Sequence, residues 1–133
     1  MDRNVRMALL WVVIMVGYCV HTLVDLLPIF FAGSVAMPDA TGQVPAAMYA
    51  FAGFIMFLLP VAGALLASYA KARAGRILHL VLAALLTLAN IFHLGDLFKE
   101  FNWGQCMVLP LILLLSVLLL WEAVQSLKHP ASN

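Results

Sequence analysis

The order of apolar and polar residues divides this chain into four long apolar runs joined by short polar links. The runs extend over about residues 7–28, 46–70, 77–98 and 105–124. A membrane-spanning helix needs about 20 predominantly apolar residues, and each run approaches or exceeds that length. The link at 33–45 is rich in Gly, Pro, Asp and Thr, and the links at 71–76 and 99–104 are short. We therefore predict one domain over residues 1–133, an all-α integral membrane protein whose four transmembrane helices form an up-down-up-down bundle.

The distribution of basic residues predicts the direction of this bundle. Six positions flank the ends that lie on one side: Arg3, Arg6, Lys71, Arg73, Arg76 and Lys128. Only Lys99 falls on the other side, next to Glu100. Because cytoplasmic loops carry an excess of Lys and Arg, both termini are predicted to be cytoplasmic. Trp11 and Trp121 would then lie in the inner aromatic belt, and Trp103 in the outer one.

Composition supports the membrane assignment and excludes other classes. The chain is 65% hydrophobic and 10% charged, whereas soluble domains carry about 25% charged residues. Its formal net charge of +1 argues against nucleic acid as a partner. The predicted partners are the lipid bilayer and either further copies of the chain or a larger membrane complex. The predicted location is the plasma membrane, which is the inner membrane in a bacterium. An alternative reading takes residues 1–36 as a cleaved signal peptide, although their apolar run exceeds the usual 7–15 residues.

Two histidine–aspartate pairs interrupt the apolar sequence, and ionisable groups inside a bilayer usually have a function. His21 and Asp25 lie near the end of the first run, and His93 and Asp96 near the end of the third. A helix rises about 1.5 Å per residue, which places His21 roughly 21 Å above Met7 and His93 roughly 24 Å above Ile77. Because these two spans run in the same direction, both pairs are predicted to lie at one depth, just beneath the outer surface.

A metal ion is one interpretation of these pairs. Two imidazoles and two carboxylates are a plausible ligand set for zinc or another divalent first-row metal. His21, Asp25, His93 and Asp96 are the predicted ligands, with Asn90 as a further polar group near the site. The aspartates would otherwise orient the imidazoles as hydrogen-bond partners. Their spacing matches no standard metal motif.

A b-type haem is a second interpretation. His21 and His93 would form an outer axial pair, and Met7 and His79 an inner one, because each helix places residues fourteen apart near one face. His79, however, lies only about 3 Å above the start of its span, which favours an interface position with its polar edge in water. Two aspartates are also unexpected beside a haem.

Further interpretations stay open. A proton or substrate path would use the same residues, but the midplane of the four spans holds no charge. Hydrogen bonds between helices, without any ligand, are the simplest explanation. No nucleophile–base or phosphate-binding motif indicates an enzyme. The leading hypothesis is a small multi-pass membrane protein with an outer-leaflet His/Asp site for a metal ion or small ligand, acting in transport or as a subunit of a complex. The alternative is a structural subunit without a site.

Overall fold

The computed structural model describes residues 1–36, 42–98 and 101–129, and the side chain of Asp96 lies outside the described part. The regular elements of these residues are all helical, with no strand among them. Four helical segments are long and apolar enough to cross a membrane: Arg3–Phe31, Ala46–Tyr69, Arg73–Leu94 and Trp103–Lys128. The predictions of an all-helical fold and of four candidate spans are therefore confirmed. The predicted bounds differ from these by a few residues at most ends.

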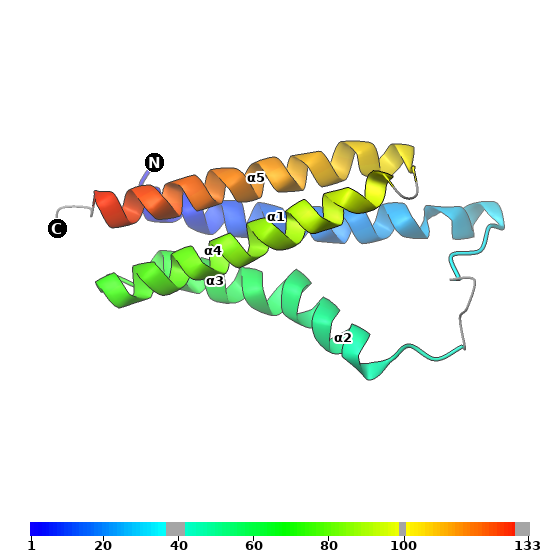
Figure 1. Cartoon of the computed structure of the whole chain (residues 1–133), viewed down its shortest axis with the longest axis horizontal. Coiled ribbons are helices and arrows are strands. Elements are labelled where there is room, and N and C mark those ends of the chain that lie inside the picture. The colour runs from blue at the N-terminus through cyan, green and yellow to red at the C-terminus, as the bar shows by residue number, and fades with distance from the viewer. Residues whose placement is uncertain (37–41, 99–100, 130–133) are drawn as a thin grey trace.

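The four segments run back and forth along the long axis of the molecule (Figure 1). The first consists of α1 (Arg3–Leu26) and the 3-10 helix η1 (Leu27–Phe31), which has Pro28 in its first turn. The second consists of α2 (Ala46–Gly53), the π-helical turn η2 (Phe54–Leu58) and α3 (Leu59–Tyr69). The third is α4 (Arg73–Leu94), which continues into the 3-10 helix η3 (Gly95–Phe98), and the fourth is α5 (Trp103–Lys128).

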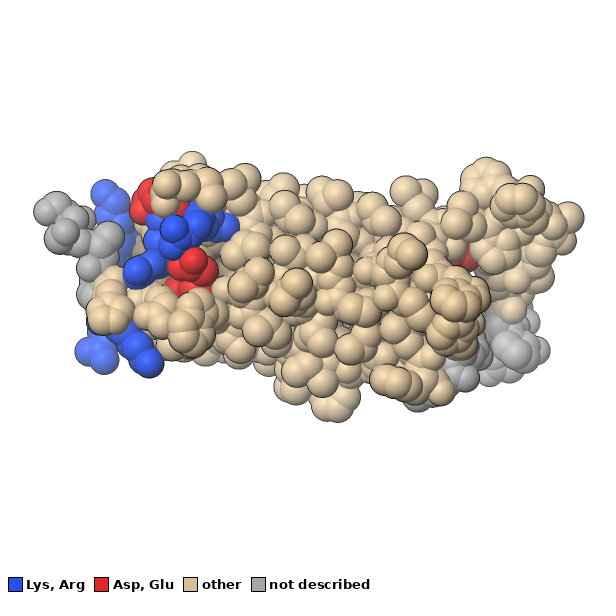
Figure 2. Space-filling model, turned by 90° about the horizontal axis from the view of Figure 1, so that it is seen from above, with Lys and Arg blue, Asp and Glu red and all other residues tan. Residues whose placement is uncertain are grey.

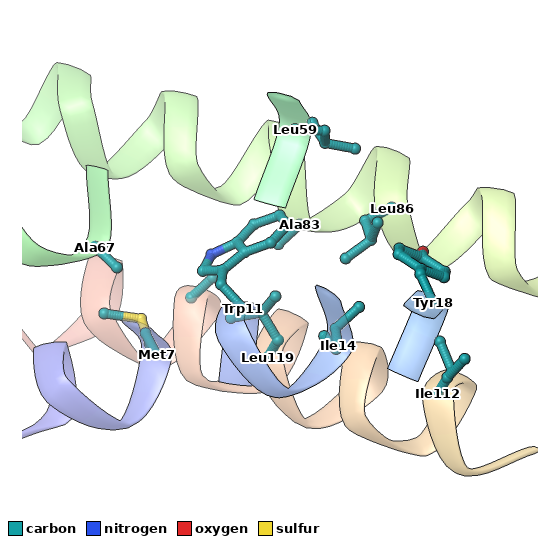
Figure 3. Close-up of a cluster of buried hydrophobic side chains, with 11 residues drawn as sticks. Met7, Trp11, Ile14, Tyr18, Leu59, Ala67, Ala83, Leu86, Ile112 and Leu119 are labelled. Atoms are coloured by element: carbon teal, nitrogen blue, oxygen red, sulfur yellow. The ribbon is translucent and has the colours of Figure 1, made fainter. Parts of the chain in front are cut away.

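The core lies along one stripe of each long helix. On α1 the buried residues recur every three or four positions, which places them on one face: Met7, Trp11, Ile14 and Tyr18. The matching stripe on α5 comprises Leu109, Ile112, Ser116, Leu119 and Ala123. Figure 3 shows the α1 residues facing side chains of α3, α4 and α5. Helix α1 packs on α3 and α5, and α4 packs mainly on α5.

The second segment changes direction at a proline. Pro60 has no N–H, and its ring would clash with the carbonyl four residues earlier in a regular helix. The preceding turn widens instead: η2 is π-helical, and the N–H of Leu59 bonds to the carbonyl of Phe54, five residues back. Helix α2 then diverges from the bundle, and none of its residues is buried (Figure 1). The bundle is therefore closed around α3 and open beside α2.

Charged side chains gather at the end that holds the start of α1 and the end of α5 (Figure 2). Glu122 forms ion pairs with Arg6, at 3.0 Å, and with Arg3, at 3.6 Å. Arg76 Nη1 donates to the carbonyl of Ser126, 3.2 Å away. The basic residues predicted to share one side thus meet at one end, where they join α1, α4 and α5.

Two expectations about the inner interface were wrong. Trp11 does not lie in an aromatic belt, because its side chain is fully buried in the core. His79 does not reach the surface either: it is 2% exposed, and its Nε2 accepts a hydrogen bond of 2.8 Å from the indole N–H of Trp11. Each residue satisfies the other's polar atom, which lets both leave the interface. Trp103 and Trp121 are exposed, as belt residues would be.

Candidate functional site

His21 on α1 and His93 on α4 meet in the half of the bundle opposite the charged end. Their Nε2 atoms are 3.0 Å apart. The rings meet edge to face, with centroids 4.8 Å apart and planes at 84°. Residues separated by 72 positions thus share one contact, because α1 and α4 run in the same direction and reach the same level. The rise per residue predicted the common level of the two histidines but not their contact.

Gln105, near the start of α5, fixes the orientation and the hydrogen position of His21. Its Nε2 donates to the carbonyl of His21, at 3.1 Å, and to a carboxylate oxygen of Asp25. Both partners only accept, so the amide oxygen must be the atom that lies 2.7 Å from His21 Nδ1. That oxygen accepts, and Nδ1 therefore carries a hydrogen. In the neutral ring His21 Nε2 then has a free lone pair directed at His93, whose Nε2–H donates to it.

Asp25 completes the described polar group. Its second carboxylate oxygen lies 3.5 Å from His21 Nε2, and its side chain is half exposed. The other predicted carboxylate, that of Asp96, lies outside the described part of the chain. Within the described residues, no group of three or more His, Cys, Asp or Glu side chains has the arrangement of a metal site. Asp25 is thus held by Gln105 at the edge of the histidine pair, toward the exposed surface.

Asn90, one helical turn before His93 on α4, adds a buried amide to this region. Its Oδ1 accepts a hydrogen bond of 2.8 Å from the hydroxyl of Tyr18. The residue is 5% exposed, and its Nδ2 has no hydrogen-bond partner in the described part of the molecule. An unpaired buried donor costs about 1–3 kcal/mol. Asn90 therefore holds two N–H groups that need an acceptor.

A pocket of about 740 Å³ adjoins these polar groups. Its polar part is formed by Tyr18, His21, Thr22, Asn90 and His93. The apolar part comes from α2, η2 and α4: Phe51, Ala52, Ile55, Met56, Leu85, Leu88, Ala89 and Phe92. The pocket lies where α2 leaves the bundle, so its existence depends on the turn before Pro60. Its size and its mostly apolar walls are typical of small-molecule sites.

The haem interpretation fits this geometry poorly. Two axial nitrogens on opposite sides of one iron would be about 4 Å apart, with metal–nitrogen bonds of about 2.0 Å as in zinc sites. The observed 3.0 Å between His21 and His93 leaves no room for a porphyrin between the rings. At the inner position, Nε2 of His79 is already engaged with Trp11. Met7 is buried in the hydrophobic core.

Sequence reasoning did not identify Gln105 and Tyr18 as site residues. Gln105 contacts the His21 ring, and Tyr18 donates to the amide of Asn90. Gln105 is a single polar residue at the start of an apolar run, where many residues face water, and Tyr18 resembles any aromatic core residue. A signal was nevertheless present, since Tyr18 precedes His21 by three positions and so shares its helix face.

Comparison of the chain with protein families, curated proteins and solved structures finds no match to any of them. The four candidate membrane-spanning helices indicate a multi-pass membrane protein.

Proposed function

We propose that this protein binds a small lipid-soluble molecule in the pocket between α1, α2 and α4. One observation supports this proposal most directly. A largely apolar cavity of about 740 Å³ adjoins the buried amide of Asn90, whose Nδ2 donor is unpaired. Apolar walls favour a hydrocarbon body, and a few convergent polar groups fix its orientation. Asn90 and the histidine pair supply those groups.

The position of the pocket supports access from the membrane rather than from water. Phe51, Leu88 and Phe92 line it and are 67%, 49% and 71% exposed, so its rim is apolar. In a chain whose helices span a bilayer, such a rim faces lipid. A lipid-soluble ligand would therefore enter sideways, beside α2.

Recovery of bound compounds from the purified protein tests this proposal. We expect mass spectrometry of an organic extract to find a lipophilic compound at near-stoichiometric amount in the wild type and not in Ala89→Phe, which fills the pocket. Ala84→Phe is the matched control, because Ala84 is exposed on the same helix and does not line the pocket. Equal recovery from both variants, or none from the wild type, would contradict the proposal.

A metal ion is a second candidate, favoured by the distance between the two imidazoles. Two nitrogens that bind one metal at adjacent positions, with bonds of about 2.0–2.1 Å, lie about 2.9–3.4 Å apart. The Nε2 atoms of His21 and His93 are 3.0 Å apart, and Gln105 holds the His21 ring with this nitrogen unprotonated. Asp25 is the nearest described carboxylate.

Elemental analysis of the detergent-purified protein decides on the metal. The second candidate predicts a stoichiometric first-row metal that is lost in His21→Ala and His93→Ala and kept in His129→Ala, whose histidine is exposed at the end of α5. Metal that persists in the first two variants, or its absence from the wild type, would leave the pair as a hydrogen-bonded contact. Absence of both ligand and metal would favour a structural subunit.

A further inference from the structure

We infer that the ligand of the pocket carries a neutral carbonyl oxygen on a planar ring, as a lipid-soluble quinone does. This inference rests on the proposed function, since it names the chemical class of the molecule in that pocket. It follows from three properties of the lining: an unpaired donor, the absence of Lys and Arg among the described lining residues, and aromatic walls.

The unpaired donor selects an acceptor. Tyr18 donates to Asn90 Oδ1 and occupies that side of the amide, so the two N–H groups of Nδ2 remain. A ligand oxygen that accepts from Nδ2 would remove the cost of the unpaired donor, whereas a hydrocarbon group at the same place would not. Nδ2 is covered in this conformation, so the ligand must displace a neighbouring side chain to reach it. Met56, which lines the pocket, is unbranched and adapts readily.

The charges around the pocket select a neutral acceptor over a carboxylate. The described lining residues include no Lys or Arg. An anionic head group would therefore be buried without a fixed cation, which is costly. It would also lie near the carboxylate of Asp25, which is 3.5 Å from His21 Nε2. A ketone or quinone oxygen accepts the same hydrogen bond without this cost.

The aromatic residues favour a flat head group. Tyr18, Phe51 and Phe92 come from three different helices and all line the pocket. Aromatic rings pack well against other rings, either offset or edge to face. The apolar residues of α2 and α4 would then contact a hydrocarbon chain that extends toward the lipid. A ring with a carbonyl and an apolar tail matches all three features.

Three probes that share one tail test the class of ligand. They are 2-methyl-1,4-naphthoquinone with a geranyl chain, the corresponding naphthalene without oxygen, and the corresponding 1-naphthol, each radiolabelled. Binding is measured with the full-length protein in phosphatidylcholine nanodiscs and corrected for partition into empty nanodiscs. We expect the quinone to bind about fivefold to tenfold more tightly than the naphthalene, as one good hydrogen bond provides.

Two variants of Asn90 should abolish this preference. Asn90→Leu removes the amide, and Asn90→Asp keeps an acceptor for Tyr18 while removing the amide N–H groups, which guards against a folding defect in the first variant. Thr87→Val is the control: Thr87 is buried one turn away on α4, bonds to the carbonyls of Ala83 and Ser116, and does not line the pocket. It should keep the preference of the wild type.

The outcomes separate the ligand class from the pocket itself. Equal binding of quinone and naphthalene to the wild type, with both lost in Ala89→Phe, would overturn the carbonyl inference and support the pocket. Tighter binding of the naphthol than of the quinone would also overturn it, since the pocket would then prefer a hydroxyl to a carbonyl oxygen. Failure of all three probes to bind would count against the pocket as a ligand site and against the carbonyl inference.

Discussion

The side-chain oxygen of Gln105 lies 2.7 Å from Nδ1 of His21, and this contact between α5 and α1 determines which nitrogen of the imidazole carries hydrogen. The same amide donates to the His21 carbonyl and to Asp25, so it cannot turn over without losing both bonds. A neutral His21 ring therefore presents the lone pair of Nε2 to His93. The donor and acceptor nitrogens of the histidine pair therefore depend on Gln105, which does not line the pocket.

The hydrogen position on His21 is directly testable. In ¹⁵N-histidine-labelled protein, we expect the neutral form of His21 to carry its hydrogen on Nδ1. In Gln105→Leu the preference should be lost, because the acceptor is gone, and the free energy of unfolding should fall by about 1–2 kcal/mol through the loss of buried hydrogen bonds. Met107→Leu, an exposed change on the same helix, should alter neither. An Nε2-protonated His21 in the wild type would refute the assignment of the amide.

The depth of the histidines could be predicted from sequence, but the pocket beside them could not. His21 and His93 share a level because rise per residue is constant in a helix, and two spans that run in the same direction are in register once their ends are known. The pocket depends on α2 leaving the bundle at the turn before Pro60. Proline marks such a place in the sequence, but whether neighbouring helices absorb the change is decided by packing.

Packing between helices, which sequence patterns do not reveal, also explains why the predicted position of Trp11 was wrong. Tryptophan near the end of a span usually lies at the interface, and the prediction followed that preference. Its core position instead requires two other residues: His79, which accepts from its N–H, and Gly63, which leaves room for the ring. Such pairings join residues 50 to 70 positions apart, and periodicity within one span contains no information about them.

Gly63 on α3 should not tolerate a side chain. A Cβ at this position would clash with Cε2 of Trp11, and that ring is buried in the core. We expect Gly63→Ala to lower the free energy of unfolding by about 1–3 kcal/mol, as overpacking usually does. Gly53→Ala is the control, since no atom lies within 4 Å of the added Cβ and the backbone is helical there. Equal stability of the two variants, measured by reversible unfolding in detergent, would contradict the observed packing of Trp11.

His79 should stabilise the core through the hydrogen bond that its Nε2 accepts from Trp11. Replacing it with leucine keeps much of the volume but leaves the indole N–H without its acceptor, so we expect a loss of about 1–3 kcal/mol in the free energy of unfolding. The Trp11 indole proton should also shift upfield in NMR spectra. His129→Ala, at the exposed end of α5, should leave both measurements unchanged. An unaltered Trp11 resonance in His79→Leu would rule out the hydrogen bond.

The direction of the bundle in the membrane can be tested with single cysteines. In a background with Cys19→Ser and Cys106→Ser, Tyr69→Cys and Trp103→Cys place thiols at opposite ends, at positions where the native side chains are 78% and 79% exposed. Six of the seven Lys and Arg residues flank the end that holds Tyr69. Because such residues stay on the cytoplasmic side, we expect a membrane-impermeant maleimide to label Trp103→Cys in intact cells and Tyr69→Cys only after permeabilisation.

The reverse labelling pattern would invert the bundle and place the histidine pair near the cytoplasm. The pocket would keep its residues in that case, because its geometry does not depend on direction, but its ligand would have to be available in the inner leaflet. Labelling of both cysteines in intact cells would instead contradict a uniform orientation. The expected pattern places Asp25, half exposed beside His21, at the outer surface.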